Sequence, residues 1–246
     1  MNKLVISKRK KNEISHFSNL ERIWWGALSP AGQKRYDKRF ELFKDLCRPQ
    51  KNDEILEIGA GDGEFTKRLS TLSSQIVATD ITPAVVKRGR RYFQSTHKNN
   101  VRFSVEDAES LSYKKGTMDI VCGVSILHHI DYKQALKEAY RVLKPGGVIF
   151  FSEPNLINPV IYLGLHIKFL RKRMEFSTNE TALLKWKVTK ILKTLGYSKY
   201  QVNNYDFLYP HTPTKLITMV NGLSNILEKT PLIRDISGSL IIWAKK

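Results

Sequence analysis

Residues 55–63 read ILEIGAGDG, and this stretch decides the fold. An apolar run typical of a buried strand, 55–58, is followed by Gly59, Gly61 and Gly63 and then by a segment compatible with a helix. Glycine lacks a Cβ and tolerates positive φ, so such a turn lets the backbone approach a ligand closely. The G-x-G-x-G spacing, with Glu64 next, differs from the G-x-G-x-x-G of dinucleotide-binding turns. Alone, the stretch could also be an ordinary strand-to-helix turn.

Strands and helices alternate on both sides of this turn. We expect strands at 53–58, 75–79, 101–105, 118–123 and 148–152, and helices at 63–72, 83–94 and 133–143. The run Lys144-Pro145-Gly146-Gly147 is expected to form a turn. This alternation predicts an α/β protein with a Rossmann-like, doubly wound parallel sheet, which binds ligands at the carboxyl ends of its strands.

The flanking segments differ from this central pattern. Residues 1–48 are predicted to be a basic tail (1–15) followed by a helical cap, in which Pro30 begins a helix over 30–47 behind the capping residue Ser29. Residues 49–246 are predicted to form the main domain. Within it, the apolar segment that becomes basic at 168–173 suggests a helical lid insertion at about 155–180 or an interfacial element. A helix is expected at 180–195, and strands at 198–208 and 238–245.

The charge of the chain indicates an anionic partner. Among 246 residues, 41 are Lys or Arg and 23 are Asp or Glu, which gives a formal net charge of +18. Such an excess attracts nucleic acid, an anionic membrane or a phosphorylated substrate, and it does not choose among them. A basic surface kept for solubility is the remaining alternative.

Cysteine usage and hydropathy suggest the compartment. Cys47 and Cys122 are the two cysteines, and they lack metal-ligand spacing, so we expect free thiols and no metal site. The N-terminus lacks the pattern of a signal peptide, and no run of about 18 apolar residues suggests a membrane span. We therefore expect a cytoplasmic protein, with peripheral membrane contact left open.

Two acidic positions follow predicted strands. Asp80 ends the strand at 75–79 and is well placed to accept hydrogen bonds from ribose hydroxyls. The loop 106–109, Glu-Asp-Ala-Glu, could accept a hydrogen bond from an adenine amino group. The simpler interpretations are a helix cap for Asp80 and a solvated acidic loop for 106–109.

Six motifs occur in the order of a known family: 56–63 (LEIGAGDG), 78–80 (ATD), 105–108 (VEDA), 118–121 (MDIV), 126–131 (ILHHID) and 141–147 (RVLKPGG). Together they resemble class I S-adenosylmethionine-dependent methyltransferases of the small-molecule type found in ubiquinone and menaquinone biosynthesis. The resemblance implies a seven-stranded sheet with an antiparallel last strand and S-adenosylmethionine as cofactor. It implies as cofactor-binding residues Glu57, Gly59, Ala60, Gly61, Asp80, Ile81, Asp107 and Ala108.

Three residues are candidates for catalysis. His129 and His128 follow the strand at 118–123, beside the expected position of the cofactor's methyl group, and either could act as a base on an acceptor hydroxyl. Glu153, at the end of the next strand, could orient a histidine or bind the acceptor. All three could instead be structural. We expect O-methylation of a small-molecule or lipid-linked acceptor.

Two rival functions remain open. An RNA or DNA methyltransferase fits the charge, but the loops at 123–126 and 153–156 lack the Asn/Asp-Pro-Pro-aromatic motif of base amino-methylation. A non-catalytic nucleoside-binding module would keep the fold without the reaction. In the flanks, Trp24 and Trp25 could close over the cofactor, and aromatic residues at 205–211 could line an acceptor pocket or belong to the core. The sequence leaves the oligomeric state open.

Overall fold

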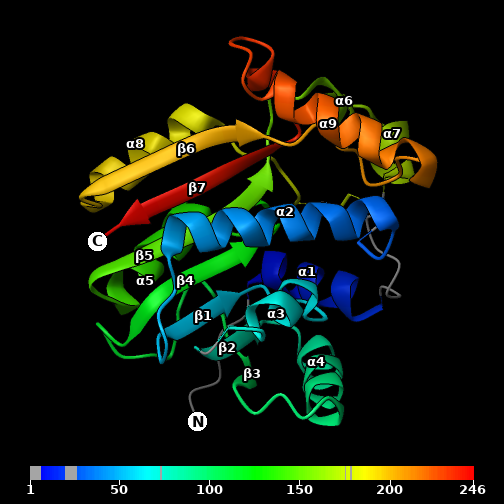
Figure 1. The fold of residues 1–246 in the computed structure, drawn as a ribbon. Coiled ribbons are helices and arrows are strands. Elements are labelled where there is room, and N and C mark those ends of the chain that lie inside the picture. Colours follow the sequence, from blue (N-terminus) through cyan, green and yellow to red (C-terminus); the bar gives the residue numbers. More distant parts are fainter. Residues whose placement is uncertain (1–6, 20–26, 73, 175, 178) are drawn as a thin grey trace.

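A seven-stranded sheet crosses the molecule in the order β3-β2-β1-β4-β5-β7-β6 (Figure 1). The computed structural model describes residues 7–19, 27–72, 74–174, 176–177 and 179–246. Strands β1 to β5 pair in parallel, whereas β7 is antiparallel to both β5 and β6, so the predicted sheet is confirmed. The strands are β1 (Glu54–Ile58), β2 (Gln75–Asp80), β3 (Val101–Val105), β4 (Met118–Val124), β5 (Leu143–Pro154), β6 (Lys199–Tyr205) and β7 (Ser239–Lys245).

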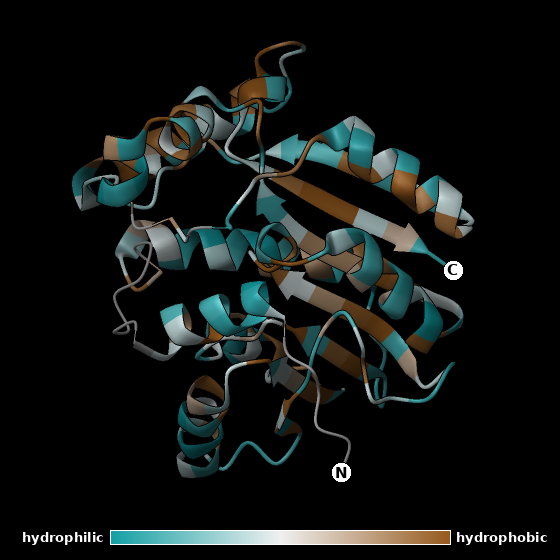
Figure 2. Ribbon diagram, turned by 180° about the vertical axis from the view of Figure 1, so that it is seen from behind, coloured by the Kyte–Doolittle hydropathy of each residue, from teal (hydrophilic) through white to brown (hydrophobic). Residues whose placement is uncertain are grey.

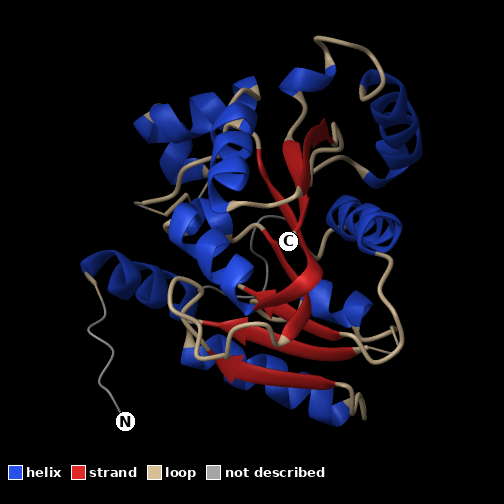
Figure 3. Cartoon of the chain, turned by 90° about the vertical axis from the view of Figure 1, so that its left-hand side faces the viewer, coloured by secondary structure: helices blue, strands red, loops and turns tan. Residues whose placement is uncertain are grey.

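Helices cover both faces of the sheet (Figure 3). The α-helices are α1 (Lys8–Asn19), α2 (Pro30–Cys47), α3 (Glu64–Leu69), α4 (Pro83–Ser95), α5 (Tyr132–Val142), α6 (Pro159–His166), α7 (Lys168–Arg173), α8 (Lys185–Leu195) and α9 (Ile217–Leu227). Short 3₁₀ turns are η2 (Leu127–His129), η3 (Thr214–Leu216) and η4 (Arg234–Ile236).

The alternation of side chains along β1 explains the two layers. Ile55 packs on one face in a cluster with Phe43 of α2 and Phe65 of α3. Leu56 packs on the opposite face in a cluster with Leu136 of α5. Because successive strand side chains point to opposite faces, a strand that is buried at consecutive positions, as β1 is from Ile55 to Ile58, must be covered on both faces. The central strands accordingly carry the hydrophobic colours of Figure 2.

Local signals predicted several boundaries correctly. Helix α2 spans the predicted 30–47, and the Ser29 hydroxyl accepts a hydrogen bond from the Gly32 amide at 2.9 Å. Helix α8 ends at Gly196, which has a φ of 87°. Glycine adopts this left-handed conformation without the strain of a Cβ, and so it ends helices efficiently.

Other expectations need correction. Residues 8–15 are helical in α1 rather than a mobile tail, while 1–6 and the two tryptophans at 24 and 25 lie outside the described residues. The expected turn at 144–147 falls within β5. The helix expected from 180 begins at Lys185, because the Leu183 carbonyl accepts a hydrogen bond from the Leu156 amide. The apolar–basic segment forms two helices, α6 and α7.

Candidate functional site

A cavity of about 260 Å³ opens at the carboxyl ends of β1, β2 and β4. We call it the first cavity. All eight residues that the sequence analysis grouped around a cofactor line it, and they come from the glycine turn, the end of β2 and the loop after β3: Glu57, Gly59, Ala60, Gly61, Asp80, Ile81, Asp107 and Ala108. The parallel sheet brings them together because its carboxyl ends share one edge.

The glycine turn combines close packing with a bare backbone. A Cβ on Gly59 would lie 2.4 Å from Cγ1 of Ile126, so no side chain fits there. A Cβ on Gly61 would meet nothing within 4 Å, because this residue borders the cavity. Both residues have positive φ, 66° and 56°. The turn therefore presents unshielded main chain to a ligand.

Two carboxyls lie beside this turn, of which Glu57 is buried and Asp80 partly buried. Glu57 is 1% exposed and accepts a hydrogen bond from the Thr66 hydroxyl at 2.6 Å. Burial raises the pKa of Glu57 to about 8, and the nearby Asp80 adds to the rise. Asp80 accepts hydrogen bonds from the amides of Gly61, at 3.2 Å, and Thr82, at 2.9 Å. Burial raises the pKa of Asp80 as well, so this carboxyl both fixes the turn and borders the cavity.

The acidic loop after β3 pairs with the basic helix α1. Lys10 lies 2.5 Å from Asp107 Oδ2 and 3.0 Å from Glu109 Oε2, and Arg9 also bonds Glu109. Arg9 donates a second hydrogen bond, of 2.8 Å, to the backbone carbonyl of His129. The loop is therefore neutralised by protein cations rather than only solvated. The complementary charges of 8–11 and 106–109 were visible in the sequence, but their separation gave no reason to join them.

Glu153 organises the loop that follows β4. Its Oε1 accepts hydrogen bonds from the amides of Ile126, at 3.0 Å, and Leu127, at 2.9 Å, while its Oε2 lies 2.7 Å from His128 Nδ1. With its side chain fully buried, Glu153 borders neither cavity described here. It therefore holds His128 and the η2 turn in place.

The two adjacent histidines face different surroundings. His129 lines the first cavity, and its Nδ1 lies 3.3 Å from Oε2 of Glu13 on α1. Burial, together with the neighbouring His128, lowers the pKa of His129, which favours the neutral imidazole that can accept a proton. His128 Nε2 points instead towards Glu180 Oε1, 3.6 Å away. Sequence reasoning named both histidines and missed both glutamates.

A second cavity of about 120 Å³ adjoins the first. Ala27, Tyr36 and Ser125 line both cavities, so the two spaces meet at the end of β4. The wall of the second cavity comes from α2, the ends of β5 and β7, and the segments around 161 and 176–181. The aromatic segment 205–211, considered above as a pocket wall, does not line it; Tyr205 instead packs in the core.

One cluster of histidine and glutamate side chains could hold a metal ion, although the sequence led us to expect no metal site. His128, His129 and Glu180 place possible ligand atoms within 4.8 Å of one another, all in buried positions. That expectation rested on cysteine spacing, which carries no information about histidines and glutamates brought together by folding. His128 already uses Nδ1 with Glu153, which leaves Nε2 as its available ligand atom.

Comparison with known proteins adds a family to this geometry. The family model described as "Methyltransferase domain" matches residues 56–151. The chain is 32% identical over 163 residues to the ubiquinone/menaquinone biosynthesis C-methyltransferase UbiE of Pseudomonas fluorescens (strain Pf0-1), covering 63% of each protein. It is 26% identical over 148 residues to the ubiquinone biosynthesis O-methyltransferase of Albidiferax ferrireducens, covering 58% of each. The chain thus spans less than two thirds of the length of these relatives.

Solved structures agree in fold. A crystal structure from Thermotoga maritima, described as a SAM-dependent methyltransferase and possible histamine N-methyltransferase, matches with a TM-score of 0.62. The match covers 86% of this chain and 89% of that one, at 19% sequence identity. This similarity extends the agreement beyond residues 56–151 to most of the chain.

Proposed function

We propose that this chain, whose residues 56–151 match a methyltransferase domain, is a class I, S-adenosylmethionine-dependent enzyme that methylates a small-molecule or lipid-linked acceptor. The observation that carries the proposal is the pair of adjoining cavities, with a neutral buried imidazole, His129, in the wall of the first. The first cavity is assigned to the cofactor and the second to the acceptor.

The residues of the first cavity fit S-adenosylmethionine. The exposed main chain at Gly61 suits the amino-acid end of the cofactor, while Asp80 and Asp107 offer acceptors for ribose hydroxyls and an adenine amino group. When bound, the cofactor supplies an electrophilic methyl group on a positively charged sulfur. Holding both reactants in line can contribute about 7–11 kcal/mol to lowering the barrier.

His129 is proposed as the base that removes a proton from an acceptor hydroxyl. Its pKa lies below that of an ordinary histidine, so the neutral form prevails near neutral pH. We propose oxygen as the methylated atom. Deprotonation of a phenol also activates its ring carbons, so the same base could serve carbon methylation, the reaction named for the first relative. Analysis of the product distinguishes the two, and a C-methylated product would overturn the assignment to oxygen.

His128 and Glu153 are proposed as positioning residues. The carboxylate of Glu153 fixes both the imidazole of His128 and the backbone of the η2 turn, which carries His129. A shift of this turn would move the proposed base relative to the acceptor. A residue that acts in this way should affect turnover more than cofactor affinity.

We also propose that an anionic membrane surface can bind one end of the molecule. Among the described residues, thirteen of the seventeen exposed large hydrophobic side chains lie in 157–169 and 216–236. Helices α6, α7 and α9 lie at this end (Figure 1), and α7 carries Lys168, Arg171, Lys172 and Arg173. Exposed apolar groups beside basic groups are typical of interfacial binding. No helix of the described residues is long and apolar enough to cross a membrane.

Vesicle sedimentation tests this membrane contact. We expect the chain to sediment with phosphatidylglycerol vesicles and to lose that binding when Phe169, Met219 and Ile226, each more than 60% exposed, are changed together to Glu. The matched control is Trp186→Glu, an exposed residue of α8 outside the patch. Equal sedimentation of the triple variant and the wild type would remove the membrane from the proposal.

Methyl-labelled S-adenosylmethionine tests the central function. Incubation of the full chain with the labelled cofactor and a cell extract, followed by mass spectrometry, should reveal a labelled small molecule or lipid. Label in RNA or DNA instead would favour the nucleic-acid alternative. Cofactor binding without transfer to any component would favour the non-catalytic module.

A further inference from the structure

We propose that Arg39 anchors an anionic group of the acceptor, so that the substrate class is small molecules bearing a carboxylate or phosphate. This inference rests on the proposed function, because it takes the second cavity as the acceptor pocket. It adds a residue on α2, outside the methyltransferase motifs, that selects the acceptor by its charge.

Arg39 is a buried cation with neutral hydrogen-bond partners. It is 6% exposed, and its Nε donates to the hydroxyls of Ser152 and Tyr205, each at 3.1 Å. Within the described part of the chain, its two terminal nitrogens donate no hydrogen bond. The ring of Tyr36 lies 5.2 Å from the guanidinium carbon, and the negative charge of Asp206 attracts the group, but neither supplies a hydrogen bond to these nitrogens. A buried charge is costly unless it is fully paired, so these nitrogens can still take up an anion.

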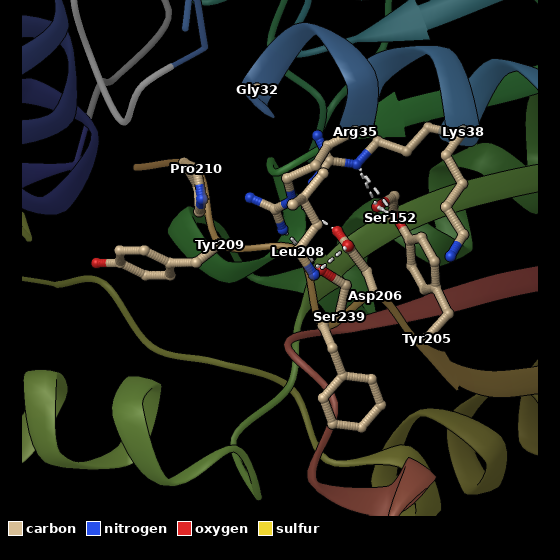
Figure 4. A network of polar contacts seen from close by, with 12 residues as sticks. Gly32, Arg35, Lys38, Ser152, Tyr205, Asp206, Leu208, Tyr209, Pro210 and Ser239 are labelled. Atoms are coloured by element: carbon tan, nitrogen blue, oxygen red, sulfur yellow. Dashed lines mark hydrogen bonds and ion pairs between the residues drawn. The ribbon is translucent and has the colours of Figure 1, made fainter. Parts of the chain in front are cut away.

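The neighbouring carboxylates are already occupied by other cations. Asp206 Oδ2 lies 2.6 Å from Nε of Arg35, and Glu228 Oε1 lies 2.6 Å from Nζ of Lys38. Figure 4 shows Arg35 and Lys38 extending from α2 towards the ends of β6 and β7. Three cations of α2 therefore share two carboxylates in this network, and the remaining positive charge is that of Arg39.

Arg39 lines the second cavity together with Arg35 and apolar side chains such as Ile161 and Phe176. A guanidinium binds carboxylate or phosphate through two parallel hydrogen bonds, which adds both affinity and orientation. An acceptor held at Arg39 would direct its other end towards Ser125, where the cavities meet.

Glu180, which lines the same cavity, does not cancel this attraction. Burial raises its pKa to about 7, so a substantial fraction of this carboxyl is protonated near neutral pH. His128 Nε2 also lies close to it. The cavity thus presents two guanidinium groups, of which Arg35 is paired with Asp206, and a carboxyl that is readily neutralised.

Binding of matched probes tests the anchor. The full chain, saturated with S-adenosylhomocysteine, is titrated by NMR with benzoate, phenyl phosphate and benzamide, which is neutral but similar in shape to benzoate. We expect at least one anion to bind about tenfold or more tightly than benzamide, as hydrogen bonds to charged groups predict. Preference for benzoate identifies a carboxylate acceptor, and preference for phenyl phosphate identifies a phosphorylated one.

Variants then locate the effect. Arg39→Met should reduce the binding of the preferred anion to the level of benzamide, and Arg39→Lys should recover part of it. Lys34→Gln, at an exposed position of the same helix that neither lines the cavity nor belongs to this network, should change nothing. If Arg39→Met does not fold, two results still test the anchor: the preference of the wild type for an anion over benzamide, and the partial loss of this preference in Arg39→Lys. Equal binding of all three probes to a chain that binds S-adenosylhomocysteine overturns the anchor alone, whereas failure to bind S-adenosylhomocysteine overturns the proposed function.

Discussion

The cofactor side of the first cavity comes largely from one stretch of sequence, whereas the second cavity is built from distant segments. Glu57, Gly61 and Asp80, which line the first, lie within one βαβ unit. Arg39 and Ser239, which line the second, lie 200 residues apart. The difference teaches that cofactor binding follows from a local motif, while acceptor selection depends on how helices and late strands pack around it.

The two cavities also differ in charge. Carboxyls predominate around the glycine turn of the first, and Arg9 and Lys10 of α1, which line the same cavity, compensate part of this charge. Guanidinium groups of α2 border the second. A cationic cofactor in the first cavity and an anionic acceptor in the second would thus each be bound by groups of opposite charge. The predictions below test this contrast, from the strongest expected effect to the weakest.

The largest effect is expected at the proposed base in the wall of the first cavity. His129→Ala should lower turnover by about 10²–10⁴-fold, the usual contribution of a general base, and leave S-adenosylhomocysteine affinity nearly unchanged. Transfer of labelled methyl and calorimetry measure the two quantities. His166→Ala, a change on the exposed helix α6, is the control.

The pH profile sharpens the same assignment. Because the pKa of His129 is lowered, turnover should remain high as the pH falls to that of an ordinary histidine, about 6.5, and decline only below it. A base with a raised pKa would lose activity at higher pH. Wild-type activity that declines well above pH 6.5, or full activity in the alanine variant, would contradict the role of His129 as base.

An intermediate effect is expected within the first cavity. Asp80→Ala should weaken S-adenosylhomocysteine binding by about 1–3 kcal/mol, because hydrogen bonds to a charged acceptor are lost. Calorimetry measures the dissociation constant. Asp119→Asn, which alters a carboxyl paired with Lys144 away from the cavity, should bind as the wild type does. An unchanged constant for Asp80→Ala would remove Asp80 from the cofactor site.

The last effect concerns stability, and it is the smallest when expressed per pH unit. Folding raises the pKa of Glu57 from 4.5 to about 8, so the folded state holds its proton more tightly than the unfolded chain does. The resulting stabilisation is complete below about pH 4.5 and is lost as the pH rises through about 8, with a slope of at most about 1.4 kcal/mol per pH unit. Glu57→Gln keeps a neutral side chain and should flatten this slope.

Chemical denaturation between pH 5 and 8 measures that slope. Glu41→Gln serves as the matched control, because Glu41 is exposed on α2. A variant Glu57→Gln that loses stability with pH as steeply as the wild type would show that Glu57 is already ionised in the folded protein.

Sequence patterns located much of the central domain. The glycine turn, the strand ends at Asp80 and Glu153, and the histidine pair were all found from local order, because each follows a strand whose apolar run is easily recognised. The prediction of a turn at Lys144–Gly147 was wrong, because the glycines that suggested it lie within β5. Helix α1 was missed because its residues are mainly polar and give a weak periodic signal.

The sequence by itself determined the sheet, its winding and the residues around the first cavity, because these depend on short apolar periods and on backbone freedom at a few glycines. Only the tertiary structure decided that α1 covers the acidic loop, that His128 and His129 face different partners, and that Arg39 has no hydrogen bond to a carboxylate among the described residues. Such contacts join residues about 50 to 120 positions apart, and their pairing depends on packing, which no local pattern encodes.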